Sequence, residues 1–154
     1  MNAAHLHLLI NHFPVVGSVF GAAFFLIALL KRNELLIKSS LWIFLAVAAT
    51  AALAYFTGDP AHEFIEKLPG LRHDIIEAHS ELADKAFIAA MVMGALALGG
   101  LFAYQKGKKL WGWYLPVLAA VSIIVVILMA VTANEGGQIR HPEILVKNVQ
   151  EIAP

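Results

Sequence analysis

Four long apolar stretches dominate the pattern of hydrophobic and polar positions along the chain. They cover residues 13–30, 39–57, 86–104 and 111–133, and none of them carries a charged residue. An apolar helix needs about 20 residues to cross the bilayer core, where a single charge costs about 2.5–3.5 kcal/mol. The pattern therefore predicts an all-α fold, a four-transmembrane-helix bundle that forms one integral membrane domain over residues 1–154.

Polar and helix-breaking residues mark the segments between and around these spans. Residues 58–80 form the largest expected loop, in which Asp59-Pro60 should begin a short helix because Asp caps and Pro suits a first helical turn. The stretch from Asp74 should lead directly into the third span. Residues 135–154 are expected to form a surface tail. Near the N-terminus, Pro14 is expected to start or kink the first helix, with Asn11 as its cap.

Lysine and arginine gather in two short loops, and this sets the expected orientation. The loops after the first and third spans contain Lys31, Arg32, Lys38, Lys106, Lys108 and Lys109. Because basic loops stay on the cytoplasmic side, both termini and the loop 58–80 should face outward. An aromatic belt at the cytoplasmic boundary is expected from Trp42, Trp111, Trp113 and Tyr114.

This orientation places most titratable residues on the outer face. Ten of the eleven acidic residues fall there, and so do all seven histidines: His5, His7, His12, His62, His73, His79 and His141. Neutral imidazole is the commonest metal ligand, and two imidazoles on facing helices can hold a haem iron. His12 directly precedes the first span, and His79 lies about two helical turns before the third. We therefore expect these two as the main cofactor ligands.

Three other outer residues complete the candidate site. His7 and His141 are candidate metal ligands beside His12 and His79. Arg140 is a candidate partner for a haem propionate or an acidic side chain.

Small residues follow His79 along one face of the third span. They are Ala83, Ala86, Ala90, Gly94 and Ala97. Such a stripe gives room for a flat macrocycle or lets membrane helices pack closely, and close packing is the more usual outcome. The two halves of the chain also show a weak parallel repeat, His12 with Gly58 and His79 with Gly137, which predicts His12 and His79 as counterparts.

Three sequence runs carry a resemblance to a known group of proteins. They are His5-Leu6-His7 with Asn11-His12-Phe13-Pro14, then Ile76-Glu77-Ala78-His79, then Gly136-Gly137-Gln138-Ile139-Arg140-His141-Pro142. The chain resembles a group of small, uncharacterised bacterial four-helix integral membrane proteins. Its His-Phe-Pro motif is also similar to a broader membrane family of unknown function. The resemblance implies a multi-pass protein of the bacterial inner membrane, whose outer face is periplasmic, and it implies no activity.

Composition excludes several classes of function. The chain has no cysteine, which excludes disulfides, iron–sulfur clusters and covalent c-type haem. Its formal net charge is zero, which gives a nucleic-acid partner no electrostatic support. No nucleophile lies in a recognisable catalytic setting, so the chain is not expected to be an independent enzyme.

Three functions fit these observations. The first is a b-type membrane cytochrome that passes electrons between a quinone or a redox partner protein and an acceptor. The second is a membrane protein that binds copper, zinc or iron through an outer imidazole cluster of His5, His7, His12, His79 and His141. The third is an accessory subunit without a cofactor, packed in the lipid bilayer as a homo-oligomer or within a larger complex.

Overall fold

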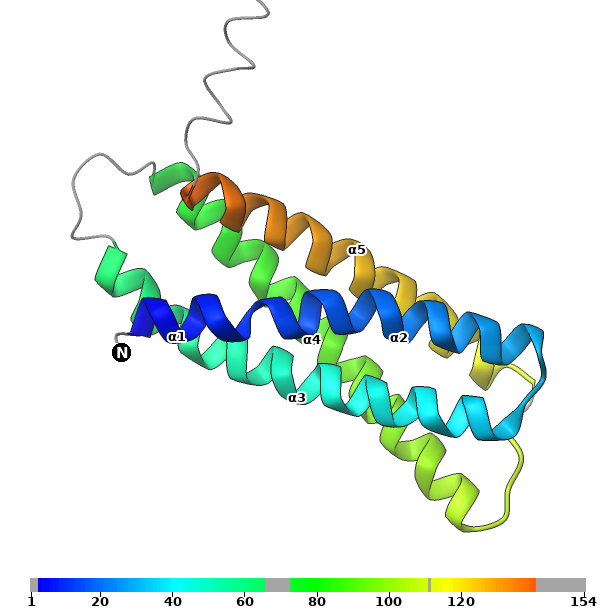
Figure 1. Cartoon of the computed structure of the whole chain (residues 1–154). Coiled ribbons are helices and arrows are strands. Elements are labelled where there is room, and N and C mark those ends of the chain that lie inside the picture. The colour runs from blue at the N-terminus through cyan, green and yellow to red at the C-terminus, as the bar shows by residue number, and fades with distance from the viewer. Residues whose placement is uncertain (1–2, 66–72, 111, 141–154) are drawn as a thin grey trace, which may run out of the picture.

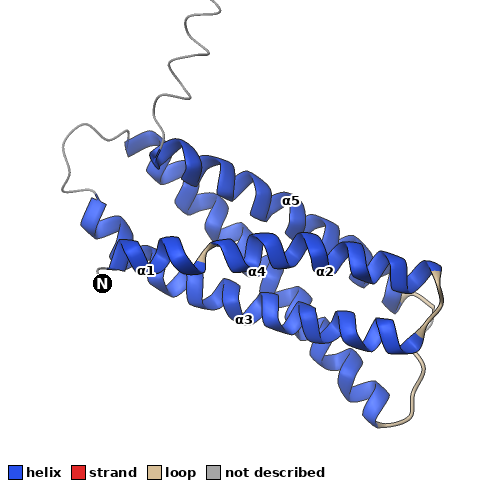
Figure 2. Ribbon diagram, in the orientation of Figure 1, coloured by secondary structure: helices blue, strands red, loops and turns tan. Residues whose placement is uncertain are grey.

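The computed structural model describes residues 3–65, 73–110 and 112–140, and this part of the chain is all-α (Figures 1 and 2). Its helices are α1 (Ala3–Ile10), α2 (His12–Leu30), α3 (Glu34–Ile65), α4 (His73–Gln105) and α5 (Tyr114–Arg140). Four stretches are long and apolar enough to cross a membrane: His5–Leu30, Glu34–His62, His73–Gln105 and Tyr114–Ile139. The prediction of an all-α chain with four such helices is confirmed.

The helices run side by side, so that the chain reverses direction at two ends of one bundle. The N-terminus, the end of α3, the start of α4 and the end of α5 lie together (Figure 1). We call this the histidine end, because His7, His62, His73 and His79 belong to it. The opposite end holds the two short connections, which carry Lys31, Lys106, Lys108 and Lys109, and the start of α3 with Lys38. We call it the lysine end.

The helices extend further at the histidine end than the apolar pattern predicts. Residues 58–65 continue α3 and residues 73–80 belong to α4, so most of the expected loop is helical. The prediction of a separate short helix at Asp59-Pro60 is wrong, because α3 runs through Pro60. This proline removes only one backbone donor close to the end of the helix. The expected tail is likewise helical as far as Arg140, and residues 141–154 lie outside the described part.

A one-residue interruption at Asn11 joins α1 to α2. Asn11 keeps helical dihedral angles (φ −59°, ψ −24°) and its side chain makes no capping bond, so its predicted role as a cap is wrong. The first helix begins well before it, at Ala3. Pro14 lies buried three residues further on and has no N–H to donate to Ile10, which explains why the helix is disturbed here rather than continuous.

Small residues on α4 form the contact with α3. Ala86, Ala90, Gly94 and Ala97 are all buried, and a Cβ built on Gly94 would lie 2.6 Å from the Cβ of Ala48. The stripe of small residues is therefore a packing surface along most of its length. Larger core side chains fill the neighbouring layers: Phe25, Leu41, Phe44, Met93, Leu118 and Val125.

Aromatic residues at the lysine end divide into two groups. Trp42 and Trp113 are mostly exposed, at 63% and 73%, as expected of side chains at a membrane boundary. Tyr114 instead points inward, and its hydroxyl donates a hydrogen bond to the carbonyl of Leu96. Trp111 lies outside the described residues. Which side of the membrane this end faces stays a prediction.

We expect Gly94→Ala to lower the free energy of unfolding by about 1–3 kcal/mol, because the added methyl group overpacks the contact with Ala48. Gly99 on the same helix has open space where its Cβ would be. Gly99→Ala should therefore leave stability unchanged or raise it by up to about 1 kcal/mol. Unfolding of both variants in one detergent checks this, and equal effects would contradict the packing argument.

Candidate functional site

The six described histidines occupy different environments. His5, His12 and His73 are exposed, whereas His7, His62 and His79 are half-buried. His141 and the side chain of Arg140 lie outside what the structure describes. Of the predicted ligands, His7 and His79 are therefore the ones that the structure places toward the interior.

His7 and His79 face each other across the interior of the bundle. Their ring centroids are 6.5 Å apart, and the ring planes are nearly perpendicular at 87°. His7 comes from α1 and His79 from α4, and α3 packs against both of these helices. Two half-buried imidazoles from opposite halves of the chain thus form the centre of the candidate site.

Backbone carbonyls hold both rings in one orientation. The Nδ1 atom of His7 lies 3.0 Å from the carbonyl oxygen of Ala54, and that of His79 lies 2.9 Å from the carbonyl oxygen of Thr132. A carbonyl oxygen only accepts, so each Nδ1 must carry the proton and donate. Each Nε2 then keeps its lone pair, which is the arrangement typical of metal-binding histidines.

A glycine stands beside each histidine for a steric reason. The carbonyls of Ala54 and Thr132 lie four residues before Gly58 and Gly136. A helical side chain covers the turn that precedes it, so a Cβ at either position would lie beside the incoming imidazole and would crowd it at Gly136. A Cβ on Gly136 would lie 3.0 Å from Cε1 of His79, and one on Gly58 would lie 3.6 Å from Cε1 of His7.

The two halves of the chain therefore match, but with different members from those expected. His7, Ala54 and Gly58 correspond to His79, Thr132 and Gly136. The sequence predicted His12 in the place of His7 and Gly137 in the place of Gly136. The two carbonyl acceptors and their spacing of four residues from a glycine were not predicted from the sequence. The one signal for them in the sequence is that each half of the chain has a histidine followed later by a glycine.

His12 points away from this pair. Its side chain is exposed, and its Nδ1 lies 3.0 Å from the carbonyl oxygen of Leu8 in the preceding helical turn. Five helical positions separate His7 from His12, which corresponds to about 140° around a helix. The geometry thus favours His7 over His12 as the partner of His79.

Thr57 and Glu135 make the surroundings of the two histidines unequal. The Oγ1 of Thr57 lies 3.3 Å from Nδ1 of His7, as a second partner beside Ala54. The equivalent place near His79, three residues after Thr132, belongs to Glu135, which interacts with His79 electrostatically, as does His62. His79 therefore has a neighbouring carboxylate that His7 lacks at the matching position.

The described residues contain no group of three or more His, Cys, Asp or Glu side chains arranged to hold one metal ion. The expected cluster of five imidazoles is thus not assembled within the described ranges, and His141 falls beyond them. At this centre the described residues offer two nitrogen ligands, His7 and His79.

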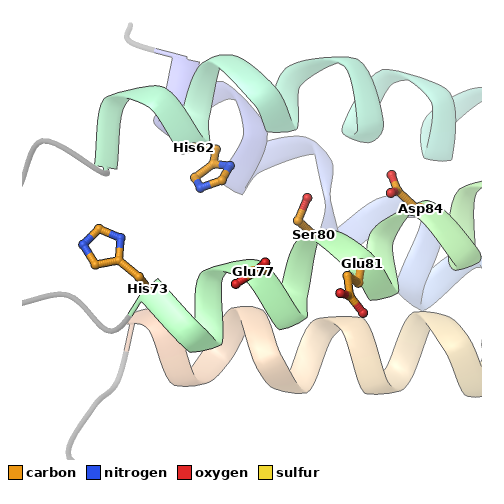
Figure 3. A pocket seen from close by; sticks show the side chains of 6 residues that line it. All are labelled: His62, His73, Glu77, Ser80, Glu81 and Asp84. Carbon is orange, nitrogen blue, oxygen red and sulfur yellow. The ribbon is translucent and has the colours of Figure 1, made fainter.

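A separate polar cavity lies between α3 and α4 at the same end (Figure 3). Its volume is about 330 Å³, and it is lined by His62, His73, Glu77, Ser80, Glu81 and Asp84. His62 points from α3 toward α4, while Ser80 and Asp84 point from α4 toward α3 (Figure 3). Tyr55 donates a hydrogen bond of 2.9 Å to Asp84, and its ring stacks on Phe87. These two contacts hold Asp84 and Tyr55 together at the inner edge of the cavity.

Comparison of the chain with known protein families, curated proteins and solved structures finds no match. The geometry of the site is therefore the basis for its function.

Selective ¹⁵N labelling of histidine should show His7 and His79 with a protonated Nδ1 and an unprotonated Nε2. The reason is that each Nδ1 faces a carbonyl acceptor. The signals of each ring are assigned by their loss in His7→Gln and His79→Gln. The exposed ring of His73 serves as the reference, with signals averaged over both tautomers. A protonated Nε2 with an unprotonated Nδ1 at either position would contradict this arrangement.

Gly136→Ala should displace the His79 ring and change its NMR signals, because the new methyl group would lie 3.0 Å from Cε1. Gly137→Ala is the matched control, since its Cβ would meet nothing within 4 Å. Gly58→Ala should perturb His7 only slightly, because 3.6 Å is an ordinary contact. Equal changes in the Gly136 and Gly137 variants would refute the steric role of Gly136.

Proposed function

We propose that this protein is a b-type membrane cytochrome that holds haem b between His7 and His79 and transfers single electrons. The observation that carries the proposal is the pair of half-buried imidazoles with both Nδ1 atoms bonded to carbonyls. Both Nε2 atoms are thereby left as ligands. This differs from the expected His12–His79 pair in one ligand only.

The spacing of the rings supports an iron atom between them. Metal–imidazole bonds measure about 2.0–2.1 Å, and a ring nitrogen lies roughly 1.1 Å from its centroid, so linear coordination would separate the two centroids by about 6.3 Å. The observed separation is 6.5 Å. Perpendicular ring planes are compatible with two axial ligands on one iron.

The number of ligands also favours haem. A zinc or iron ion without a macrocycle needs about four protein or solvent ligands, whereas a porphyrin leaves only the axial positions to the protein. Within the described ranges, two histidines without a third ligand fit the second case. Ala86, Ala90 and Ala97 are buried in the packed interior of the bundle, so the macrocycle would lie toward the histidine end.

The chain's own residues would prepare the ligands. The carbonyls of Ala54 and Thr132 hold the Nδ1 protons, which fixes the ring orientation and raises the basicity of each Nε2. Haem, when bound, supplies a metal that cycles between two oxidation states. A quinone or a redox partner protein is the proposed source or acceptor of the electron.

The proposed setting is the bacterial inner membrane, with the histidine end in the periplasm. The segregation of basic residues at the lysine end supports this orientation. Membership in the group of small bacterial four-helix membrane proteins is part of the same proposal and rests on the sequence runs described above.

A bound cuprous ion is the second candidate. A soft ion of low charge can be held by two nitrogen ligands. Unlike haem, it has no propionates that call for a basic partner. The observation that favours it is the acidic character of the described residues around the site, which include Glu77, Glu81, Asp84 and Glu135. Haem would require a cation near its propionates, and Arg140 is the proposed one.

Absorption spectra of the detergent-purified protein, oxidised and reduced, test the proposal together with metal analysis of the same sample. We expect a Soret band, with sharp visible bands after reduction. His7→Ala and His79→Ala should each lower haem content more than about tenfold, because each removes an iron ligand, whereas exposed His12→Ala should keep it.

Two results would decide against haem. One copper per chain without a Soret band, lost in the His7 and His79 variants, would establish the second candidate. Protein that stays colourless and metal-free after incubation with haem and with cuprous ion would refute both.

A further inference from the structure

The lysine end carries a strong excess of positive charge. Residues 31–42 and 104–114 contain one acid, Glu34, and six cationic side chains: Lys31, Arg32, Lys38, Lys106, Lys108 and Lys109. Trp111 is the one residue of these ranges that the structure does not describe, and tryptophan carries no charge. None of the six cations forms an ion pair with an acid in the described part of the chain. An anionic partner therefore fits this end by charge.

Lys38 is held in place at this end by an aromatic ring. It is half-buried near the start of α3, and its Nζ atom lies 4.6 Å from the centroid of the Tyr104 ring on α4. Contact with the ring orders the long side chain and leaves its positive charge intact. Glu34 lies one helical turn earlier, but these two described residues form no ion pair with each other. Lys38 is thus an ordered and partly exposed cation.

An exposed apolar stripe follows Lys38 along α3. Trp42 lies one turn further into the span, and Leu53 and Phe56 lie deeper still; all three are mostly exposed. At about 100° per residue, these four side chains fall within about 60° of one another around the helix. A phospholipid has the same order, with its phosphate at the bilayer surface and its acyl chains below, and tryptophan prefers the boundary between the two layers. One face of α3 therefore offers both a headgroup contact and a chain contact.

We propose that this face of α3 binds an anionic phospholipid, with the headgroup phosphate on Lys38 and an acyl chain along Trp42. A zwitterionic lipid carries the same phosphate, but its own ammonium group competes with Lys38 for it, so the site selects a headgroup of net negative charge. The cations of the two short connections add attraction at longer range. The proposal holds for whichever leaflet the lysine end faces, and it is independent of the haem site.

Quenching of Trp42 fluorescence by brominated lipids in mixed bilayers tests this proposal. In the full-length chain, Trp111→Phe and Trp113→Phe leave Trp42 as the one tryptophan. Bromine on an acyl chain quenches only an indole close to it, so quenching reports which lipid lies beside Trp42. We expect phosphatidylglycerol to be favoured over phosphatidylcholine about fivefold, the ratio that one lysine near an anionic headgroup supplies. Equal quenching by the two brominated lipids would refute the site.

Variants connect the selectivity to Lys38. Lys38→Gln should lower the preference for phosphatidylglycerol at least about threefold, whereas Lys38→Arg should keep it because the charge remains. Lys85→Gln is the matched control, since Lys85 lies in the half of α4 toward the histidine end and pairs with Glu81 at 3.9 Å. A preference unchanged in Lys38→Gln would assign it to the other cations and would overturn the proposed site.

Two further measurements separate charge recognition from folding and from the haem proposal. Raising the salt concentration to about 1 M shortens the screening length to about 3 Å and should weaken the preference. A preference insensitive to salt would overturn the electrostatic origin, and circular dichroism checks that each variant keeps its helical content. His79→Ala should retain the preference, because His79 lies at the opposite end of the bundle, so failure of the haem proposal leaves this result unaffected.

Discussion

Backbone hydrogen bonding in a lipid environment is the constraint on which the arrangement depends. Hydrocarbon offers no partner to a peptide group, so each span must satisfy its own N–H and C=O groups as a helix. The long helices α3 and α5, of 32 and 27 residues, carry this regular bonding to the histidine end. There the carbonyls of Ala54 and Thr132, besides serving their own helices, accept an imidazole N–H as well. The two imidazoles are thus oriented by the second lone pair of each of these helical carbonyl oxygens.

Apolar runs predicted the number and type of the helices because hydrocarbon selects strongly for them. They did not predict where the helices end, since beyond the bilayer core polar residues are tolerated in helix and loop alike. Residues 58–65 were therefore expected as loop and are helical, whereas the expected run of the chain from Asp74 into the third span is confirmed by α4. The apolar pattern also drew attention to His12, which adjoins the first span. Helical rotation turns His12 outward and His7 inward, and that could be seen only once the helix was known to begin at Ala3.

Small residues have two separate uses in this bundle. On α4, Ala86 to Ala97 and Gly94 allow a close approach to α3, and this excludes any large ligand from the middle of the bundle. At the histidine end, Gly136 makes room for an imidazole rather than for a helix. Composition alone could not separate these uses, because both require the same residue types. The distinction comes from what lies opposite each one: a methyl group in the first case and a ring in the second.

His7 and His79 come from the first and second halves of the chain, and α1 has only eight residues. A metal centre held between them would act as a reversible cross-link, closing a loop through α2 and α3 and restricting the unfolded ensemble. Without it, α1 would depend mainly on its contact with α3 to resist fraying. Protease resistance of the N-terminus would then report whether the centre is filled, and maturation of the protein would be coupled to cofactor supply.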